Sequence, residues 1–101
     1  MSYDVLHDAI VNKRQVTCLY HGHYREICPH VLGTGKDGAE MVLSFQFAGG
    51  STTRLPPGGE WRCMRVDEIK NAKSRTGDWH TGDSHLRPQT CVKDIDVEVG
   101  F

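Results

Sequence analysis

The spacing of apolar residues changes near the start of the chain, from a helical repeat to an alternating one. Residues 5–10 place Val, Leu, Ala and Ile on one stripe of a helix, and Ser2 is a favourable N-cap before them. Lys13 and Arg14 close that segment. From Val16 to Tyr20 every second side chain falls on one face, which is typical of a half-buried strand. One short helix followed by a strand is therefore expected.

The next two residues, His21 and Gly22, predict a hairpin turn, because glycine adopts positive φ freely and histidine does so more readily than most residues. The resulting register pairs Tyr20 with His23, Cys18 with Arg25, and Val16 with Ile27. Paired residues share a sheet face. Tyr20, His23 and Arg25 are therefore expected to project together.

Further strands follow at hairpin spacing. Met41, Leu43, Phe45 and Phe47 alternate, so residues 41–47 are predicted to form the core strand. The connection 48–60 is rich in glycine and proline, and one of this length is more often functional or mobile than incidental. The other expected strands are 61–66, 69–73 after a turn at Asp67-Glu68, and 95–99, which would cover the open edge of the sheet.

These elements predict a mostly β fold, a small SH3-like antiparallel barrel of about five strands with one N-terminal helix and a C-terminal extra strand. A length of 101 residues fits one domain. Within it, residues 1–76 are expected to form the helix and barrel, and residues 77–101 an extension packed on that barrel.

Composition narrows the classes of partner. Twelve Lys and Arg against 13 Asp and Glu give a net charge of -1, so binding to phosphates would need a local basic face. No apolar run approaches the ~20 residues of a membrane span, and the start lacks signal-peptide features, which predicts a cytoplasmic protein without a membrane partner.

Four widely spaced cysteines without a C-x-x-C motif predict free, mostly buried thiols. The hairpin register also places Cys18 and Cys28 on opposite faces, which argues against a disulfide between them.

Three segments together carry a family resemblance. They are Val16-Thr-Cys-Leu-Tyr20, Arg25-Glu-Ile27-Cys-Pro29-His30, and Met64-Arg65-Val66-Asp67-Glu68-Ile69. With the helix before them, they resemble the WYL family over residues 5–72. The resemblance implies a small barrel of the kind that accompanies bacterial and phage transcription regulators and is thought to bind nucleic-acid or nucleotide-like ligands. The chain shows no helix-turn-helix, so a stand-alone sensor-like module is expected.

Two departures from the family pattern concern the ligand. Glu40-Met41-Val42 stands approximately where the family has its Trp-Tyr-Leu tripeptide, and Glu68 replaces the second Arg of the late motif. Apolar alternation is kept, so the expected fold is unaffected. The exchange of a cation for an anion weakens the expectation of an anionic ligand.

A polar cluster on the barrel is the first candidate site, because guanidinium groups bind phosphate or carboxylate in two-pronged fashion and tyrosine adds a stacking face. Its predicted ligand-binding residues are Tyr20, His23, Arg25, His30, Arg62 and Arg65. Arg62 and Arg65 should face opposite ways on a strand, so at most one joins the cluster. The alternative is that these arginines form surface ion pairs with Glu26, Glu60 or Asp67.

Other chemistries are less well supported by the pattern. His21 and His23 could begin a metal site, with His30, His80 or His85 and Asp83 completing it, but nothing orders a third ligand. Cys28 or Cys91 beside a histidine could form a nucleophilic pair, yet no local signature supports one. Neither an enzyme, a metal nor a cofactor is therefore predicted.

Two glycine-rich or aromatic segments remain. Gly33 to Gly38 lacks the strand-to-helix setting of a phosphate loop and is predicted to be a turn. Trp79-His80 and His85-Leu86-Arg87-Pro88 could form a lid, a partner surface or an anchor of the tail.

The leading hypothesis is a non-catalytic, WYL-like regulatory module that binds an anionic nucleotide, short oligonucleotide or small metabolite. The alternative is a protein interaction module without a small-molecule ligand, including a homodimer through the C-terminal strand.

Overall fold

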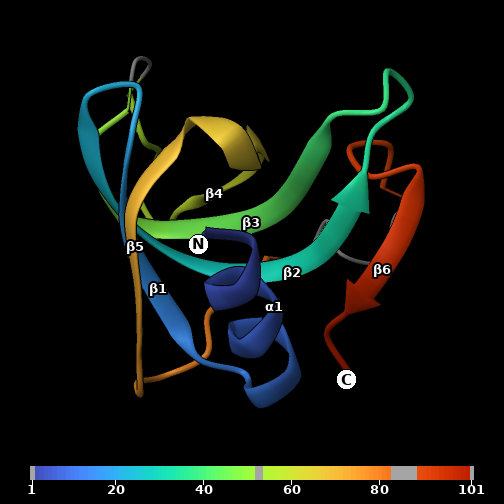
Figure 1. Cartoon of the computed structure of the whole chain (residues 1–101). Helices are drawn as coiled ribbons and strands as arrows, with labels where there is room; N and C mark the ends of the chain where they lie inside the picture. Colours follow the sequence, from blue (N-terminus) through green and yellow to red (C-terminus); the bar gives the residue numbers. More distant parts are fainter. Residues whose placement is uncertain (1, 52–53, 83–88, 101) are drawn as a thin grey trace.

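The computed structural model describes residues 2–51, 54–82 and 89–100, and over these residues the chain is mostly β (Figure 1). One antiparallel sheet of six strands bends around a short N-terminal helix. In chain order the elements are α1 (Ser2–Asn12), β1 (Gln15–Tyr20), β2 (His23–Thr34), β3 (Glu40–Gly49), β4 (Glu60–Arg65), the 3-10 helix η1 (Val66–Glu68), β5 (Ile69–Arg75) and β6 (Asp94–Glu98).

The strand order is β4-β3-β2-β1-β5, and β6 pairs with the end of β2. β2 is 12 residues long, so its first part pairs with β1 and its last part with β6. Figure 1 shows β2 and β3 curving strongly around the helix. The predicted fold, a small antiparallel barrel with an N-terminal helix and an extra C-terminal strand, is confirmed.

The hairpin between β1 and β2 has the predicted register. Tyr20 pairs with His23, and the pairing continues without a shift to Val16 and Ile27. Both turn residues have positive φ, 51° at His21 and 77° at Gly22, as a type I′ turn requires. The turn chemistry therefore determines which side chains of the two strands share a face.

The apolar stripe of α1 closes one end of the barrel. Leu6, Ala9 and Ile10 are at most 1% exposed and belong to one cluster with Val16 and Ile27 of the hairpin. Burial of such side chains, rather than the propensity of an 11-residue helix, is what stabilises α1.

The predicted core strand, residues 41–47, lies within β3, which is central in the sheet between β2 and β4, but its alternating apolar residues do not form the inner face. The pairing with β4 instead places Val42, Ser44 and Gln46 on the inner face, and all three are fully buried. The four apolar residues lie on the outer face. Alternation identifies residues that share a face, but it does not say which face points inward.

The outer face is covered by the segment that follows β5. The ring of Phe47 stacks on His80 at 4.1 Å, and Phe45 meets Trp61 edge to face at 5.4 Å. The backbone N–H of His80 donates to the Cys28 Sγ at 3.3 Å. A second, aromatic layer thus lies outside the barrel, and it explains why the outer face of β3 is apolar.

The prediction of four free thiols is wrong for two cysteines. Cys63 on β4 and Cys91 before β6 form a disulfide, with a Cα–Cα distance of 5.7 Å. Their separation of 28 positions is closed only by tertiary structure, which the spacing of cysteines does not predict. Cys18 and Cys28 are free and buried, as predicted.

The structure bears on the predicted absence of a membrane span, but it does not test the predicted compartment. No helix in the described part of the chain is long and apolar enough to cross a membrane. The cytoplasmic location stays a prediction, and a structural disulfide is more typical of an oxidising compartment.

Candidate functional site

The six residues predicted to bind a ligand are not brought together. Tyr20, Arg25 and Arg62 lie on the inner face of the barrel, with His23 at its rim. His30 lies in the aromatic layer outside the sheet, and Arg65 lies on the outer face of β4. The prediction that Arg62 and Arg65 face opposite sides is confirmed.

Arg25 is only 3% exposed and is held by neutral groups. Its Nη2 donates to the Tyr20 carbonyl at 3.1 Å, and its Nη1 donates to the Gln46 Oε1 at 3.3 Å. Its Cζ lies 5.0 Å from the centre of the Tyr20 ring. Burial and the neighbouring Arg62 lower the pKa of Arg25. Arg25 therefore crosslinks β1, β2 and β3 inside the barrel, with its donors directed at the protein.

Arg62 is attached to the loop beside β4. Its Nη1 lies 3.1 Å from the Glu60 Oε2, and its Nη2 donates to the Ser51 Oγ at 3.3 Å. The Arg62 Nε and the Oγ of Ser44, its cross-strand partner, are buried without a hydrogen-bond partner among the described residues.

His30 uses both ring nitrogens within the protein. Its Nδ1 lies 2.7 Å from the Cys28 carbonyl oxygen and its Nε2 lies 3.1 Å from the Thr81 Oγ1. Its ring also contacts Trp61 and Trp79, at 4.6 and 4.8 Å between centres. His30 therefore anchors the segment after β5 to the sheet, in agreement with the anchoring alternative for Trp79.

The residues weighed for metal and nucleophile chemistry occupy other settings. His21 lies 2.8 Å from a Glu68 carboxylate oxygen and stacks on Tyr20, and no group of three or more His, Cys, Asp or Glu within the described ranges could hold a metal ion. Burial raises the pKa of Cys28 to about 11, which keeps its thiol protonated near neutral pH, and Cys91 is oxidised. Asp83 and His85, with the segment to Pro88, lie outside the described residues.

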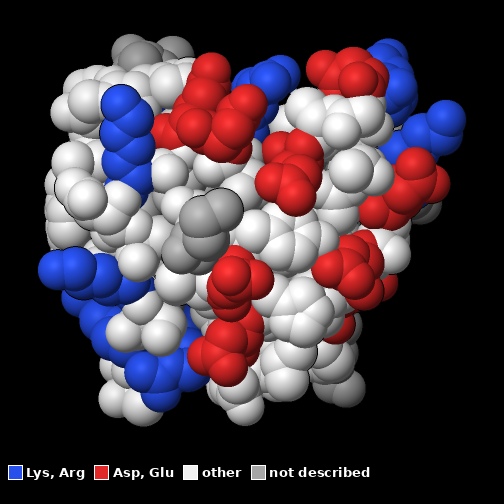
Figure 2. Space-filling view, in the orientation of Figure 1, with Lys and Arg blue, Asp and Glu red and all other residues white. Residues whose placement is uncertain are grey.

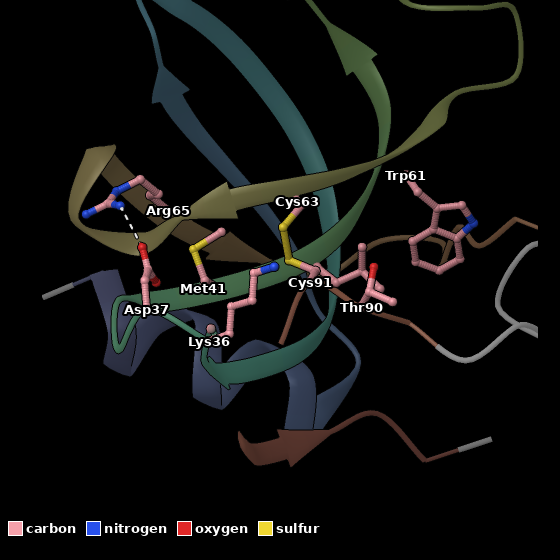
Figure 3. A pocket seen from close by; sticks show the side chains of 10 residues that line it. Lys36, Asp37, Met41, Trp61, Cys63, Arg65, Thr90 and Cys91 are labelled. Atoms are coloured by element: carbon pink, nitrogen blue, oxygen red, sulfur yellow. Dashed lines mark ion pairs between the residues drawn. A yellow bond between two sulfur atoms is a disulfide. The ribbon is translucent and has the colours of Figure 1, made fainter. Parts of the chain in front are cut away.

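A groove lies on the outer face of β3 and β4, with a volume of about 540 Å³ (Figure 3). Small-molecule sites commonly have volumes of roughly 300–1,000 Å³. The turn after β2 forms one wall, and the chain that leads into β6 forms another. Figure 3 shows Trp61 at one end of this groove and Arg65 at the other, with the disulfide between them.

Strand pairing explains the apolar floor of the groove. Met41 pairs with Arg65 and Leu43 pairs with Cys63, so all four side chains share the outer face. The disulfide and Trp61 extend this surface. Figure 3 shows the Trp61 ring nitrogen pointing away from the disulfide. The floor of the groove is therefore apolar.

The charged groups of the groove lie at the end near Arg65. The guanidinium donates to both Asp67 carboxylate oxygens, at 3.1 and 3.3 Å, and its Nη1 lies 3.8 Å from an Asp37 oxygen. The hydrogen bonds with Asp67 raise the pKa of Arg65 and lower that of Asp67, so both stay charged. Lys36 forms no ion pair with a described residue, so among these residues the groove has one cation held by carboxylates, Arg65, and one that is not, Lys36.

Sequence reasoning missed most of this groove. Of its lining residues only Arg65 was among the predicted ligand-binding residues, while Lys36 was assigned to a simple turn. A signal was present, since Trp61, Cys63 and Arg65 alternate along one strand and must share the face of Arg65. The contribution of Cys91 had no such signal, because it comes from a distant segment.

The fold and the groove define a small β barrel with a solvent-facing ligand-sized site. Comparisons with protein-family models, with curated proteins and with solved structures find no match to this chain. The WYL resemblance consequently stays a prediction that rests on the residues quoted for it.

Proposed function

We propose that this protein is a non-catalytic, WYL-like ligand-binding and regulatory module, and that its groove binds an anionic ligand of the nucleotide class. One observation carries the proposal: an apolar floor that ends in Trp61 lies beside two cations, Lys36 and Arg65, in a groove of suitable volume. A ligand with a planar apolar part and a negatively charged group matches both features.

The recognition would divide between the two ends of the groove. A base would lie against Trp61, because aromatic side chains stack favourably on π systems. A phosphate would bind Lys36 and the Nη1 of Arg65, whose 3.8 Å distance to Asp37 is too long for a strong hydrogen bond. Asp67 would keep the guanidinium in place.

The resemblance supports the same groove. Arg65 belongs to the late motif, and Met41 lies near the position of the family's naming tripeptide. These two residues are distant in sequence, yet they are cross-strand partners and both line the groove. The proposal therefore shifts the ligand site from Tyr20 and Arg25, which are buried, to the outer face of β3 and β4.

The test is to titrate nucleoside monophosphates and short single-stranded oligonucleotides into the protein and to measure the heat of binding by isothermal titration calorimetry. Lys36→Ala/Arg65→Ala should weaken binding at least about tenfold, since roughly 1.4 kcal/mol of lost interaction corresponds to that factor. Lys13→Ala, which removes an exposed cation outside the groove, should bind as the wild type does. Equal affinity of the double variant and the wild type, or no binding of any probe, would overturn the proposal.

A further inference from the structure

Three strands, β4, β5 and β6, each have one edge without a partner strand in the described part of the chain, because β4 and β5 end the strand order and β6 pairs with β2 alone. Figure 1 shows β5 and β6 on opposite sides of the molecule, with α1 between them. An edge of unpaired backbone N–H and C=O groups can accept a strand from another molecule.

The edges of β5 and β6 carry opposite charge. On β6, Asp94, Asp96 and Glu98 are all exposed, and a register shift against β2 between Ile95 and Val97 interrupts the regular alternation of its faces. Figure 2 shows basic side chains gathered at the lower left, on the side of β5, and mainly acidic side chains over the centre and right, with some basic ones at the top and upper right.

The basic residues of β5 share one face of their strand. Lys70, Lys73 and Arg75 are exposed, and their partners on β1 alternate from Leu19 to Gln15. Cations therefore project from the outer face along the whole length of β5.

Charge opposes pairing of like edges. In an antiparallel pair of two β6 strands centred on Asp96, Asp94 would face Glu98 and Asp96 would face its own copy. Like charges directly opposite each other destabilise a strand pair, whereas opposite charges stabilise it. The homodimer through the C-terminal strand is therefore disfavoured, while β6 against β5 places acidic side chains beside basic ones.

We propose that copies of this chain assemble head to tail, with β6 of one copy added to the free edge of β5 in the next. The contact joins two different surfaces, so it gives a ring if the rotation between copies closes and an open filament if it does not. The partner of each edge is a second copy of this chain, and the groove takes no part in the contact.

The experiment is sedimentation velocity over a range of concentrations at about 50 mM and about 500 mM salt, because screening weakens exposed charge pairs. The wild type should associate with rising concentration at low salt, and less so at high salt. Lys70→Glu/Lys73→Glu and Asp94→Lys/Glu98→Lys should each associate about 30-fold more weakly, from two reversed pairs. These positions leave the Arg75–Glu26 and Tyr3–Asp96 contacts intact.

Mixing the two variants provides the decisive outcome. Each variant alone should associate weakly, because its β5 and β6 edges carry charge of the same sign. The mixture again offers an acidic edge to a basic one, so association should return. Asp4→Lys/Asp8→Lys on α1 is the matched control and should behave as the wild type, and circular dichroism checks that all variants fold. A monomeric wild type at both salts, or a mixture that stays monomeric, would refute head-to-tail assembly.

Discussion

Removal of the disulfide between Cys63 and Cys91 should destabilise the protein mainly through its unfolded state. The bond closes a loop of 28 positions. In the chain-entropy description, a loop of that length restricts the unfolded chain by about 3.5 kcal/mol at 25 °C. Cys63 is exposed and Cys91 half-buried at the wall of the groove, so replacement by serine leaves no core cavity to add to this value.

Equilibrium unfolding in urea measures the effect. With a slope of about 1.5 kcal/mol/M, Cys63→Ser/Cys91→Ser should unfold at about 2 M less urea than the oxidised wild type. A reductant should lower the wild-type midpoint to that of the variant and leave the variant unchanged, because Cys18 and Cys28 are already free. A difference below about 1 kcal/mol would refute the reasoning, since it would mean that the covalent bond restricts the unfolded chain very little.

Two further perturbations test the barrel interior and the outer layer. Arg25→Ala should lower the free energy of unfolding by about 3 kcal/mol, measured in urea, because it removes buried donors from two oxygen acceptors. The raised pKa of Cys28, about 11 against 9 for the ordinary thiol, means that the folded state keeps this proton longer than the unfolded state does. Stability should therefore be complete below pH 9 and fall as pH rises towards 11, with a flatter dependence in Cys28→Ala. An unchanged slope in that variant would argue against the assignment.

The local parts of the fold could be predicted from the sequence. The register of the first hairpin follows from the positive φ that His21 and Gly22 can adopt, which is information contained in two residues. The helix α1 could likewise be predicted, from a stripe of apolar residues and from its N-cap residue. In both cases the determinants lie within a few positions of each other, so no knowledge of the rest of the chain is needed.

Which face of each strand points to the barrel interior could not be predicted in the same way. The register correctly put Tyr20 and Arg25 on one face, but that face is closed by α1 and by the inner side of β3 rather than open to a ligand. For β3 the apolar face pointed outward, because a second layer covers it. Alternation does not show which face of a strand points inward. A strand that is covered on both sides also lacks the polar outer face that usually distinguishes the two.

The groove shows why the site depends on tertiary structure beyond the family resemblance. Its floor comes from β3 and β4, inside residues 5–72, but Thr90 and Cys91 belong to the extension outside that range. The disulfide joins these two parts and is itself part of the wall. The same bond that stabilises the chain therefore also determines the shape of the proposed ligand site, so reduction should change ligand affinity even where the barrel remains folded. Binding measured with and without reductant, well below the unfolding midpoint, separates this local effect from loss of the fold.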